Sequence, residues 1–356
     1  MIITVEMLPP PPIGKTGFPW TEGSTPPQYK SQKLPSISIV TPSFNQGKFI
    51  EETIRSVLLQ NYAGLEYIVI DGNSTDETIE ILRKYSQFLN YWISEPDDGQ
   101  ADAILKGLEQ ATGEVFNWLN SDDVYLPNAL QKVGQYFAEN PMLDVLCARE
   151  HQRIETTGVQ TTTNGTTISS KLEETVAHAF VNQPPTFFRT TVFREAGLEK
   201  KFHFLMDADV WVSYLLQRGQ QNVLKTTNIL DIFRVHGKAK SSTMLTTYYR
   251  ERLAILLSIS RSLSATQRIP EDFLKDHPFL TTLFSKTYII QTEINERLLA
   301  AYLAERVLYY FVEFISWQSL FVLYFFSLRR QMFGRTYKFY IAPLVKIKRL
   351  FQPLPM

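Results

Sequence analysis

The chain has 356 residues, 44% of them hydrophobic, so it can bury one large core or two smaller ones. Its 36 Lys and Arg residues equal its 36 Asp and Glu residues, a balance that excludes the strongly basic character typical of nucleic-acid-binding proteins, so we expect no nucleic acid partner. The lone cysteine, Cys147, excludes an intramolecular disulfide and a cysteine-rich zinc site. Because no positively charged apolar leader opens the chain, the sequence favours a reducing cytoplasmic location.

The sequence divides into three predicted regions. Residues 1–35 are rich in proline, which lacks a backbone N–H and fixes φ, so we interpret them as an extended arm rather than a packed element. Residues 36–243 form the main predicted domain. Residues 244–356 read as a different, helical region.

From Ile37 onward, short apolar runs alternate with helical patterns. Strands are predicted at 37–41, 66–71, 91–95 and 114–119. Between the first two, Ile50, Ile54 and Val57 share one helical face, and Ser74 with Glu77 forms a capping-box pattern that predicts the start of the next helix. This alternation predicts an α/β fold with a mostly parallel central sheet and flanking helices.

Polar residues follow each predicted strand, where parallel sheets bind ligands. Two of them, Asp122 and Asp123, are adjacent acids with no His or Cys nearby in sequence, a pattern that suits a hard cation such as Mg²⁺ or Mn²⁺. The alternative is a turn, since Asn and Asp commonly end strands. No Gly-x-Gly-x-x-Gly follows a strand, which weighs against a dinucleotide cofactor.

Several linked motifs, in this order and spacing, resemble the inverting family 2 glycosyltransferases of the GT-A fold. The nucleotide-binding half of that family would correspond here to residues 36–123. The motifs that resemble it are TPSFN, VIDGNSTDET, EPDDGQADAILKG and ATGEVFNWLNSDD. The acceptor half of a bacterial, polysaccharide-type branch would correspond here to residues 124–243. The motifs that resemble it are NQPPTFFR and HFLMDADVW. A further motif, FRVHGKAKSST, resembles the segment that closes the active site. The resemblance implies a GT-A, Rossmann-like domain that binds a nucleoside-diphosphate sugar.

Carried over residue by residue, the resemblance implies a place beside the nucleotide base for Thr41, Pro42 and Asn45, and a contact with the nucleotide for Asp71. Without the resemblance, a helix-capping or turn role for Asp71 is as well supported as a contact with the nucleotide.

The same resemblance implies that Asp122 faces the ribose or the cation, and that Asp123 holds the Mn²⁺ or Mg²⁺ that neutralises the diphosphate. Family members often carry Asp where this chain has Asn120, so phosphate and water would complete the shell around two carboxylates. The resemblance places Gln100 near the donor. The alternative is that Gln100 merely belongs to a solvated helix N-terminus. His236 is expected at the diphosphate or the metal, with a structural role as its alternative.

The resemblance also implies transfer with inversion, and it assigns the proton-accepting acid to Asp207. On a helix, Asp207 and Asp209 point about 200° apart, so both cannot face the acceptor. The alternative role for Asp207 is a helix cap.

The function expected is metal-dependent transfer of a sugar, from a UDP-sugar by default, to a saccharide or lipid-linked acceptor in surface polysaccharide or glycolipid synthesis. Two alternatives stay open. A sugar nucleotidyltransferase would also use an α/β sheet and a metal-binding acid, although TPSFNQG lacks the basic, glycine-rich loop typical of that class. An inactive nucleotide-binding module would bind the donor without turnover.

The C-terminal region carries an uncharged, aromatic stretch at 314–328, followed by seven basic residues between Arg329 and Arg349 with no acid among them. Since about 20 apolar residues are needed to cross a bilayer, we expect an interfacial helix beside a basic tail that meets anionic lipid, which would make the protein peripheral to the inner face of the cell membrane. The alternative is packing against protein.

Overall fold

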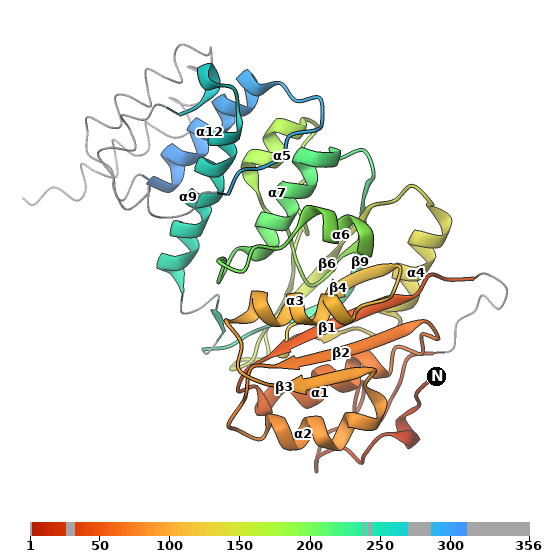
Figure 1. Cartoon of the computed structure of the whole chain (residues 1–356). Coiled ribbons are helices and arrows are strands. Elements are labelled where there is room, and N and C mark those ends of the chain that lie inside the picture. Colours follow the sequence, from red (N-terminus) through yellow and green to blue (C-terminus); the bar gives the residue numbers. More distant parts are fainter. Residues whose placement is uncertain (1, 26–32, 238, 241–243, 270–285, 312–356) are drawn as a thin grey trace, which may run out of the picture. The chain divides into compact units, whose positions relative to one another are not determined.

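A computed structural model describes residues 2–25, 33–237, 239–240, 244–269 and 286–311 (Figure 1). The chain forms two compact units. The first comprises residues 1–167, 180–214 and 220–244, and the second comprises 168–179, 215–219 and 245–356.

One sheet of nine strands organises the first unit. Its parallel part has the order β3 (Tyr91–Ser94), β2 (Leu65–Asp71), β1 (Ile37–Ser43) and β4 (Val115–Trp118). The sheet continues through β8 (Thr186–Arg189), antiparallel to β4, to β6 (Val145–Ile154), β9 (Val223–Val235) and β5 (Val124–Tyr125), while the short β7 (Gln160–Thr162) pairs with β6. The four predicted strands and the mostly parallel α/β architecture are confirmed.

Helices cover both faces of the parallel part. Helices α1 (Gly47–Leu58) and α2 (Thr78–Tyr85) pack together, and α3 (Gln100–Gln110) crosses β1 and β2 on the opposite face (Figure 1). The apolar stripe of α1 faces the core, where Ile50, Ile54 and Val57 are fully buried. Helix α3 can approach β1 closely because Gly107 has no Cβ, which would collide with the side chain of Val40.

The remaining helices of the first unit are α4 (Ala129–Glu139), α6 (Thr190–Ala196) and the beginning of α7 (Met206–Arg218), and 3₁₀ turns lie at Val5–Met7 and Ser86–Phe88. The second unit contains α5 (Leu172–His178), the end of α7, α9 (Leu245–Ser262), a 3₁₀ turn at Ala265–Gln267 and α12 (Glu296–Phe311). Within it, α12 packs against α5 and α9. Across the ranges that the structure describes, none of the helices is both long and apolar enough to cross a membrane.

The proline-rich arm is packed onto the domain, so the prediction of an unpacked extended arm is wrong for residues 2–25. Leu8 and Trp20 are 6% exposed. The fully buried Arg55 of α1 explains the docking, because its guanidinium donates to the carbonyl oxygens of Pro9, Pro19 and Trp20 at 2.7–2.9 Å. Because proline has no backbone N–H, this segment cannot form a regular ladder of backbone hydrogen bonds. The Arg55 side chain supplies hydrogen-bond donors to its carbonyl groups instead.

The predicted capping box is also wrong. Helix α2 begins at Thr78, and its N-cap residue Glu77 makes no side-chain cap hydrogen bond. Ser74 instead donates its hydroxyl to Asp71 and accepts a hydrogen bond from the backbone N–H of Asn45. A tertiary contact between two strand ends therefore replaced the local capping interaction.

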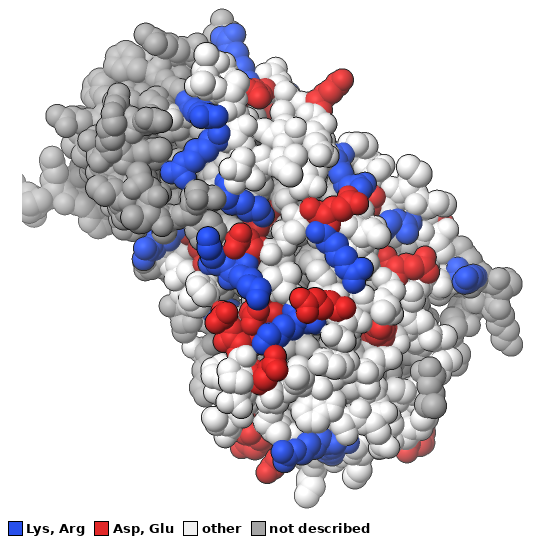
Figure 2. Space-filling model, in the orientation of Figure 1, with Lys and Arg blue, Asp and Glu red and all other residues white. Residues whose placement is uncertain are grey.

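On the face shown in Figure 2, Lys and Arg side chains lie among Asp and Glu side chains, and neither sign forms one continuous patch. The stretch 314–328 and the basic tail, for which an interfacial location is expected, lie outside the described residues.

Candidate active site

A cavity of about 790 Å³ opens at the carboxyl ends of the parallel strands. Most of one wall comes from the loops that follow β1, β2, β3 and β4. Its lining residues there are Pro42, Ser43, Phe44, Gln46, Gly72, Asp97, Gly99, Gln100, Asn120, Ser121 and Asp122. The sheet thus gathers at one place polar residues that are distant in the sequence, such as Ser43 and Asp122, as expected for parallel strands.

The other wall comes from the second half of the domain. It includes Glu150 and Gln152 of β6, residues 180–184, and Met206 and Asp207 at the start of α7. Phe233 of β9 and Lys240 also line the cavity.

Asp122, which lines this cavity, forms a close pair with His236, which does not line it. Asp122 Oδ2 lies 3.0 Å from His236 Nε2, with the side chains 18% and 8% exposed. The imidazole ring of His236 stacks on Phe49 of α1, with ring centroids 4.4 Å apart. A carboxylate oxygen and an imidazole nitrogen therefore converge, and both are donor types that Mn²⁺ accepts.

Asp123 does not line the cavity, although its neighbour does. It is fully buried, and its two carboxylate oxygens accept hydrogen bonds from Arg234 N at 3.0 Å and from Asn120 Nδ2 at 3.1 Å. Burial, reinforced by the charge of Asp122, raises the pKa of Asp123 well above its ordinary value. The structure thus separates the two adjacent aspartates, which the sequence analysis had assigned together to the cation.

Arg234 connects the segment that carries His236 with the loop that carries Asp122. Its buried guanidinium donates to Asp122 O, to Glu52 Oε2 at 3.0 Å and to Thr53 Oγ1 at 3.1 Å. It therefore ties the end of β9, which carries His236, to the loop that carries Asp122. This role could not be predicted, since nothing in the sequence around Arg234 indicates that its side chain is buried.

Gln100 lines the cavity, within a chain of polar side chains. Its Nε2 donates to Asn120 Oδ1 at 2.6 Å, and its Oε1 accepts from Lys240 Nζ at 2.7 Å. Asn120 in turn donates to Asp123. Asn120 therefore acts as a connector within this hydrogen-bond chain, and Lys240 places a cation beside Gln100.

Of the residues expected beside the nucleotide, Pro42 lines the cavity, and Thr41, Asn45 and Asp71 do not. Thr41 Oγ1 lies 3.1 Å from the Tyr67 hydroxyl, and both residues are buried. Asn45 Oδ1 accepts from Thr75 N at 2.9 Å.

Asp71 is fully buried and accepts three hydrogen bonds: from Ser74 N, Ser74 Oγ and Ser94 Oγ. It thereby shapes the loop after β2, in agreement with its turn alternative.

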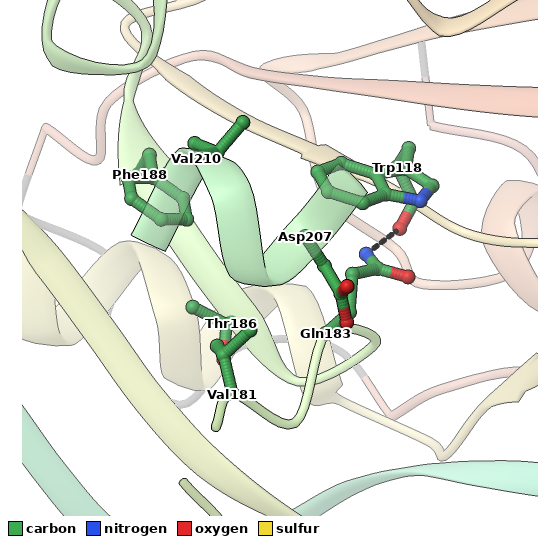
Figure 3. Close-up of a pocket in the computed structure, with 7 residues that line it drawn as sticks. All are labelled: Trp118, Val181, Gln183, Thr186, Phe188, Asp207 and Val210. Carbon is green, nitrogen blue, oxygen red and sulfur yellow. Dashed lines mark hydrogen bonds between the residues drawn. The ribbon is translucent and has the colours of Figure 1, made fainter. Parts of the chain in front are cut away.

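Asp207 lies on the first turn of α7 and lines both the main cavity and a small adjoining one of about 10 Å³ (Figure 3). The small cavity has room for about one water molecule. Its walls are mainly apolar, with Trp118, Val181, Phe188 and Val210 among them.

In Figure 3 the Asp207 side chain is directed toward Gln183, whose amide nitrogen donates to Trp118 O at 2.7 Å. Asp209 is fully buried and lines neither cavity. The two acids therefore diverge, as their spacing on a helix predicts. The alternative role of Asp207 was that of a helix cap. Asp207 is the second residue of α7, so it does not occupy the N-cap position.

Two further buried acids escaped the sequence analysis. Glu150 lines the cavity at 4% exposure, and it lies opposite the fully buried Asp231 in the β6–β9 register. Neither carboxylate oxygen of Asp231 has a hydrogen-bond partner in the part of the chain that the structure describes. Burial raises the pKa of Glu150 to about 7, and burial together with the charge of Glu150 raises the pKa of Asp231. The i, i+2 spacing of Glu150 and Gln152 indicates a shared strand face, but nothing in the sequence shows which face meets the cavity.

Comparison with protein families gives a match of residues 38–200 to the model described as "Glycosyl transferase family 2". An uncharacterized glycosyltransferase of Mycobacterium tuberculosis is 40% identical over 90 residues, which are 25% of this chain and 34% of that protein. TuaG of Bacillus subtilis, whose name assigns it to teichuronic acid biosynthesis, is 36% identical over 108 residues, 30% of this chain and 43% of TuaG. The chain thus spans less than half the length of these two relatives.

Among solved structures, residues 1–349 of S. aureus TarS, in complex with UDP, match with a TM-score of 0.51 and 16% identity, over 80% of this chain and 77% of that one. The complex of the same protein with UDP-GlcNAc gives a TM-score of 0.52 at 15% identity, over 81% and 78% of the two chains. At this identity the likeness concerns the fold, and it agrees with the expected GT-A architecture.

Proposed function

Because residues 38–200 match the model of glycosyl transferase family 2, we propose that the chain transfers a sugar from a nucleoside-diphosphate sugar to an acceptor hydroxyl with inversion of the anomeric centre. The observation that supports this proposal most is that Asp207 lines the same cavity as Asp122, the partner of His236. A proton acceptor and a cation-binding pair at one cavity are what such a displacement needs.

The donor would lie against the loops at the carboxyl ends of the parallel strands, with Pro42 and Gln100 at the cavity wall. TarS, which has a similar fold, binds UDP and UDP-GlcNAc, and on this basis we favour a UDP-sugar. Thr41, Asn45 and Asp71 would act from behind this wall, by fixing the loops that carry the contact residues.

A divalent cation, Mn²⁺ or Mg²⁺, would be held by Asp122 and His236. The fit rests on one carboxylate and one imidazole that converge at 3.0 Å beside the cavity. No three His, Cys, Asp or Glu side chains of the described ranges form a metal site by themselves, so diphosphate oxygens and water would supply the other ligands. Such a cation supplies charge neutralisation to the departing diphosphate. Asp123 would support this pair indirectly, since its own oxygens accept hydrogen bonds from Asn120 and Arg234.

Asp207 would accept the proton of the acceptor hydroxyl. The hydroxyl oxygen forms the new bond to the anomeric carbon while the bond to the diphosphate oxygen breaks, and the nucleoside diphosphate leaves with the bonding electron pair. Because attack comes from the face opposite the leaving group, the centre inverts and no covalent enzyme intermediate forms. On its small-cavity side, Asp207 is flanked by the apolar side chains of Trp118, Val181 and Val210.

The proposal is tested by incubating the full chain with UDP-, GDP- and dTDP-sugars and Mn²⁺ or Mg²⁺. We expect release of nucleoside diphosphate from one donor class, loss of this release with EDTA, and much slower release by Asp207→Asn in the presence of acceptor. A nucleotidyltransferase would instead release pyrophosphate from a nucleoside triphosphate and a sugar phosphate. An inactive module would bind the nucleotide without turnover, and either result would contradict the proposal.

The product would be a surface polysaccharide or its lipid-linked precursor, which the teichuronic acid assignment of TuaG supports by similarity. Binding to an anionic membrane through the tail beyond residue 328 belongs to the same proposal.

A further inference from the structure

The cavity wall opposite the strand ends carries a carboxylate with an open acceptor. Glu150 is 4% exposed, and its Oε1 accepts a hydrogen bond from Gln152 Nε2 at 3.2 Å. Its Oε2 receives no hydrogen bond from any residue in the described ranges. Because Glu150 lines the cavity, this oxygen can accept a hydrogen bond from a ligand there.

A second polar side chain lies beside Glu150. Asn182 is 8% exposed and lines the cavity, and its Nδ2 donates to Thr163 Oγ1 at 2.8 Å. Thr163 N in turn donates to Glu150 O at 3.0 Å. Thr163 therefore holds Asn182 next to Glu150, with the side-chain oxygen Oδ1 of Asn182 as a further acceptor for a ligand.

The loop that carries Asn182 also presents an aromatic ring and reaches the proposed base. Phe180 is 43% exposed although it lines the cavity. Val181 and Gln183 of the same loop line the small cavity beside Asp207 (Figure 3). An exposed aromatic face next to hydrogen-bonding groups suits a ligand with one apolar face and a polar edge, such as a pyranose ring.

The charges at this wall disfavour an anionic ligand. Glu150 and Asp207 are both acids, and the one Lys or Arg among the described lining residues is Lys240, which donates to Gln100 near the strand ends. A carboxylate or phosphate beside Glu150 would have a like charge close by, whereas the lining cation Lys240 pairs with Gln100. Burial raises the pKa of Glu150 to about 7, and a hydroxyl can pair with either protonation state because it both donates and accepts.

We propose that Glu150, Gln152, Phe180 and Asn182 form an acceptor subsite for a neutral pyranose, with its hydroxyls on Glu150 and Asn182 and its apolar face on Phe180. The subsite rests on the proposed function, because its position beside Asp207 would present an acceptor hydroxyl to the base. It makes Glu150 a residue that determines which acceptor is used.

The test uses p-nitrophenyl β-glucoside, β-galactoside, β-N-acetylglucosaminide and β-glucuronide as acceptor probes, with the donor that the full chain hydrolyses. We expect transfer to a neutral glycoside and at least about tenfold lower kcat/KM for the glucuronide. Glu150→Ala and Phe180→Ala should each raise KM for the neutral glycoside by about 10- to 100-fold, the range for one lost hydrogen bond to a charged group or one lost apolar contact. The rise should far exceed any change in KM for the donor.

Matched controls come from exposed positions outside the cavity. Glu109→Ala removes one exposed carboxylate side chain, and Met142→Ala removes an apolar side chain that is 75% exposed. Both should leave acceptor KM unchanged. If Glu150→Ala fails to fold, Gln152→Ala tests the same wall from a half-buried position.

Three results would overturn the subsite: an unchanged acceptor KM in the variants, a glucuronide used as well as the neutral glycosides, or donor hydrolysis with no transfer to any neutral glycoside. Failure of the proposed function looks different, because the wild-type chain would then neither hydrolyse nor transfer from any nucleoside-diphosphate sugar.

Discussion

The carboxylate of Asp122 lies 3.0 Å from the imidazole of His236, 114 positions further along the chain. The loop after β4 and the end of β9 meet here, and buried Arg234 holds them together. The pair therefore depends on the fold of the whole first unit, and it gives the cation proposal a specific test.

Replacing either partner should weaken metal-dependent nucleotide binding. Asp122→Ala and His236→Ala each remove one proposed ligand, and we expect at least about a tenfold loss of Mn²⁺-dependent affinity for UDP, since even the residues that orient metal ligands are worth about 10- to 100-fold. Calorimetric titration of UDP with and without Mn²⁺ measures this.

Asp123→Asn is the matched comparison. It should mainly lower the free energy of unfolding, by about 1–3 kcal/mol, because one buried hydrogen bond is replaced by a clash of donors. Loss of Mn²⁺-dependent binding in a fully folded Asp123→Asn, with Asp122→Ala unaffected, would reverse the two roles.

Asp207 should be the acid on which turnover depends. As general base it is worth about 10²- to 10⁴-fold, so Asp207→Asn should nearly abolish transfer while donor and metal affinity stay close to wild type. Initial rates of nucleoside diphosphate release with acceptor present give the measurement.

Asp209→Asn is the control for Asp207. Its fully buried side chain lines neither cavity, so the substitution should act on stability rather than on chemistry. Near-normal turnover in Asp207→Asn, together with loss in a folded Asp209→Asn, would show that the base was assigned to the wrong acid.

Arg55 should hold the N-terminal arm. Its guanidinium also donates to the Tyr85 hydroxyl at 2.9 Å, so Arg55→Ala would leave the buried carbonyl oxygens of Pro19 and Trp20 without this donor and would also remove hydrogen bonds to Pro9 O and Tyr85. We expect the free energy of unfolding to fall by more than about 3 kcal/mol, since each unsatisfied buried group costs about 1–3 kcal/mol. Urea denaturation measures the loss, and faster proteolysis within residues 2–25 should accompany it.

Arg83→Ala, at an exposed position of α2, is the control for Arg55 and should change stability little. Arg55→Lys should be intermediate, because one ammonium cannot reproduce the forked donors of a guanidinium. Equal stability of Arg55→Ala and Arg83→Ala would show that the arm contributes nothing to folding.

Glu150 should make stability depend on pH. Burial raises its pKa from the ordinary 4.5 to about 7, so the folded state keeps a proton that the unfolded state releases. The stability that this contributes is present in full below pH 4.5 and is lost as pH rises through 7. Glu150→Gln cannot ionise, so it lacks this pH dependence. The free energy of unfolding of Glu150→Gln minus that of wild type should therefore increase as pH rises from 4.5 to 7, by up to about 1.4 kcal/mol per pH unit.

Urea denaturation at several pH values from 4 to 8 measures this difference. Glu109→Gln, at an exposed position, should give a curve parallel to wild type. If Glu150→Gln is also parallel to wild type, the carboxyl group of Glu150 titrates normally in the folded protein.

The periodicity of the sequence determined the four parallel strands, the helices between them and the gathering of polar residues at one edge of the sheet. These features depend on local spacing, because a period of two or 3.6 residues decides which face of an element is buried. The separation of Asp207 from Asp209 follows from the same geometry. The motifs then indicated a family and a set of candidate residues.

Only the tertiary structure decided which of those residues reach the cavity. Asp122 and Asp123 look equivalent in sequence, yet one pairs with His236 and the other is buried against Asn120 and Arg234. Glu150 reaches the cavity because of the β6–β9 register, and the arm packs because one buried arginine satisfies its carbonyl groups. Each outcome depends on partners from distant segments, whose positions are fixed by chain topology and burial rather than by any neighbour in the sequence.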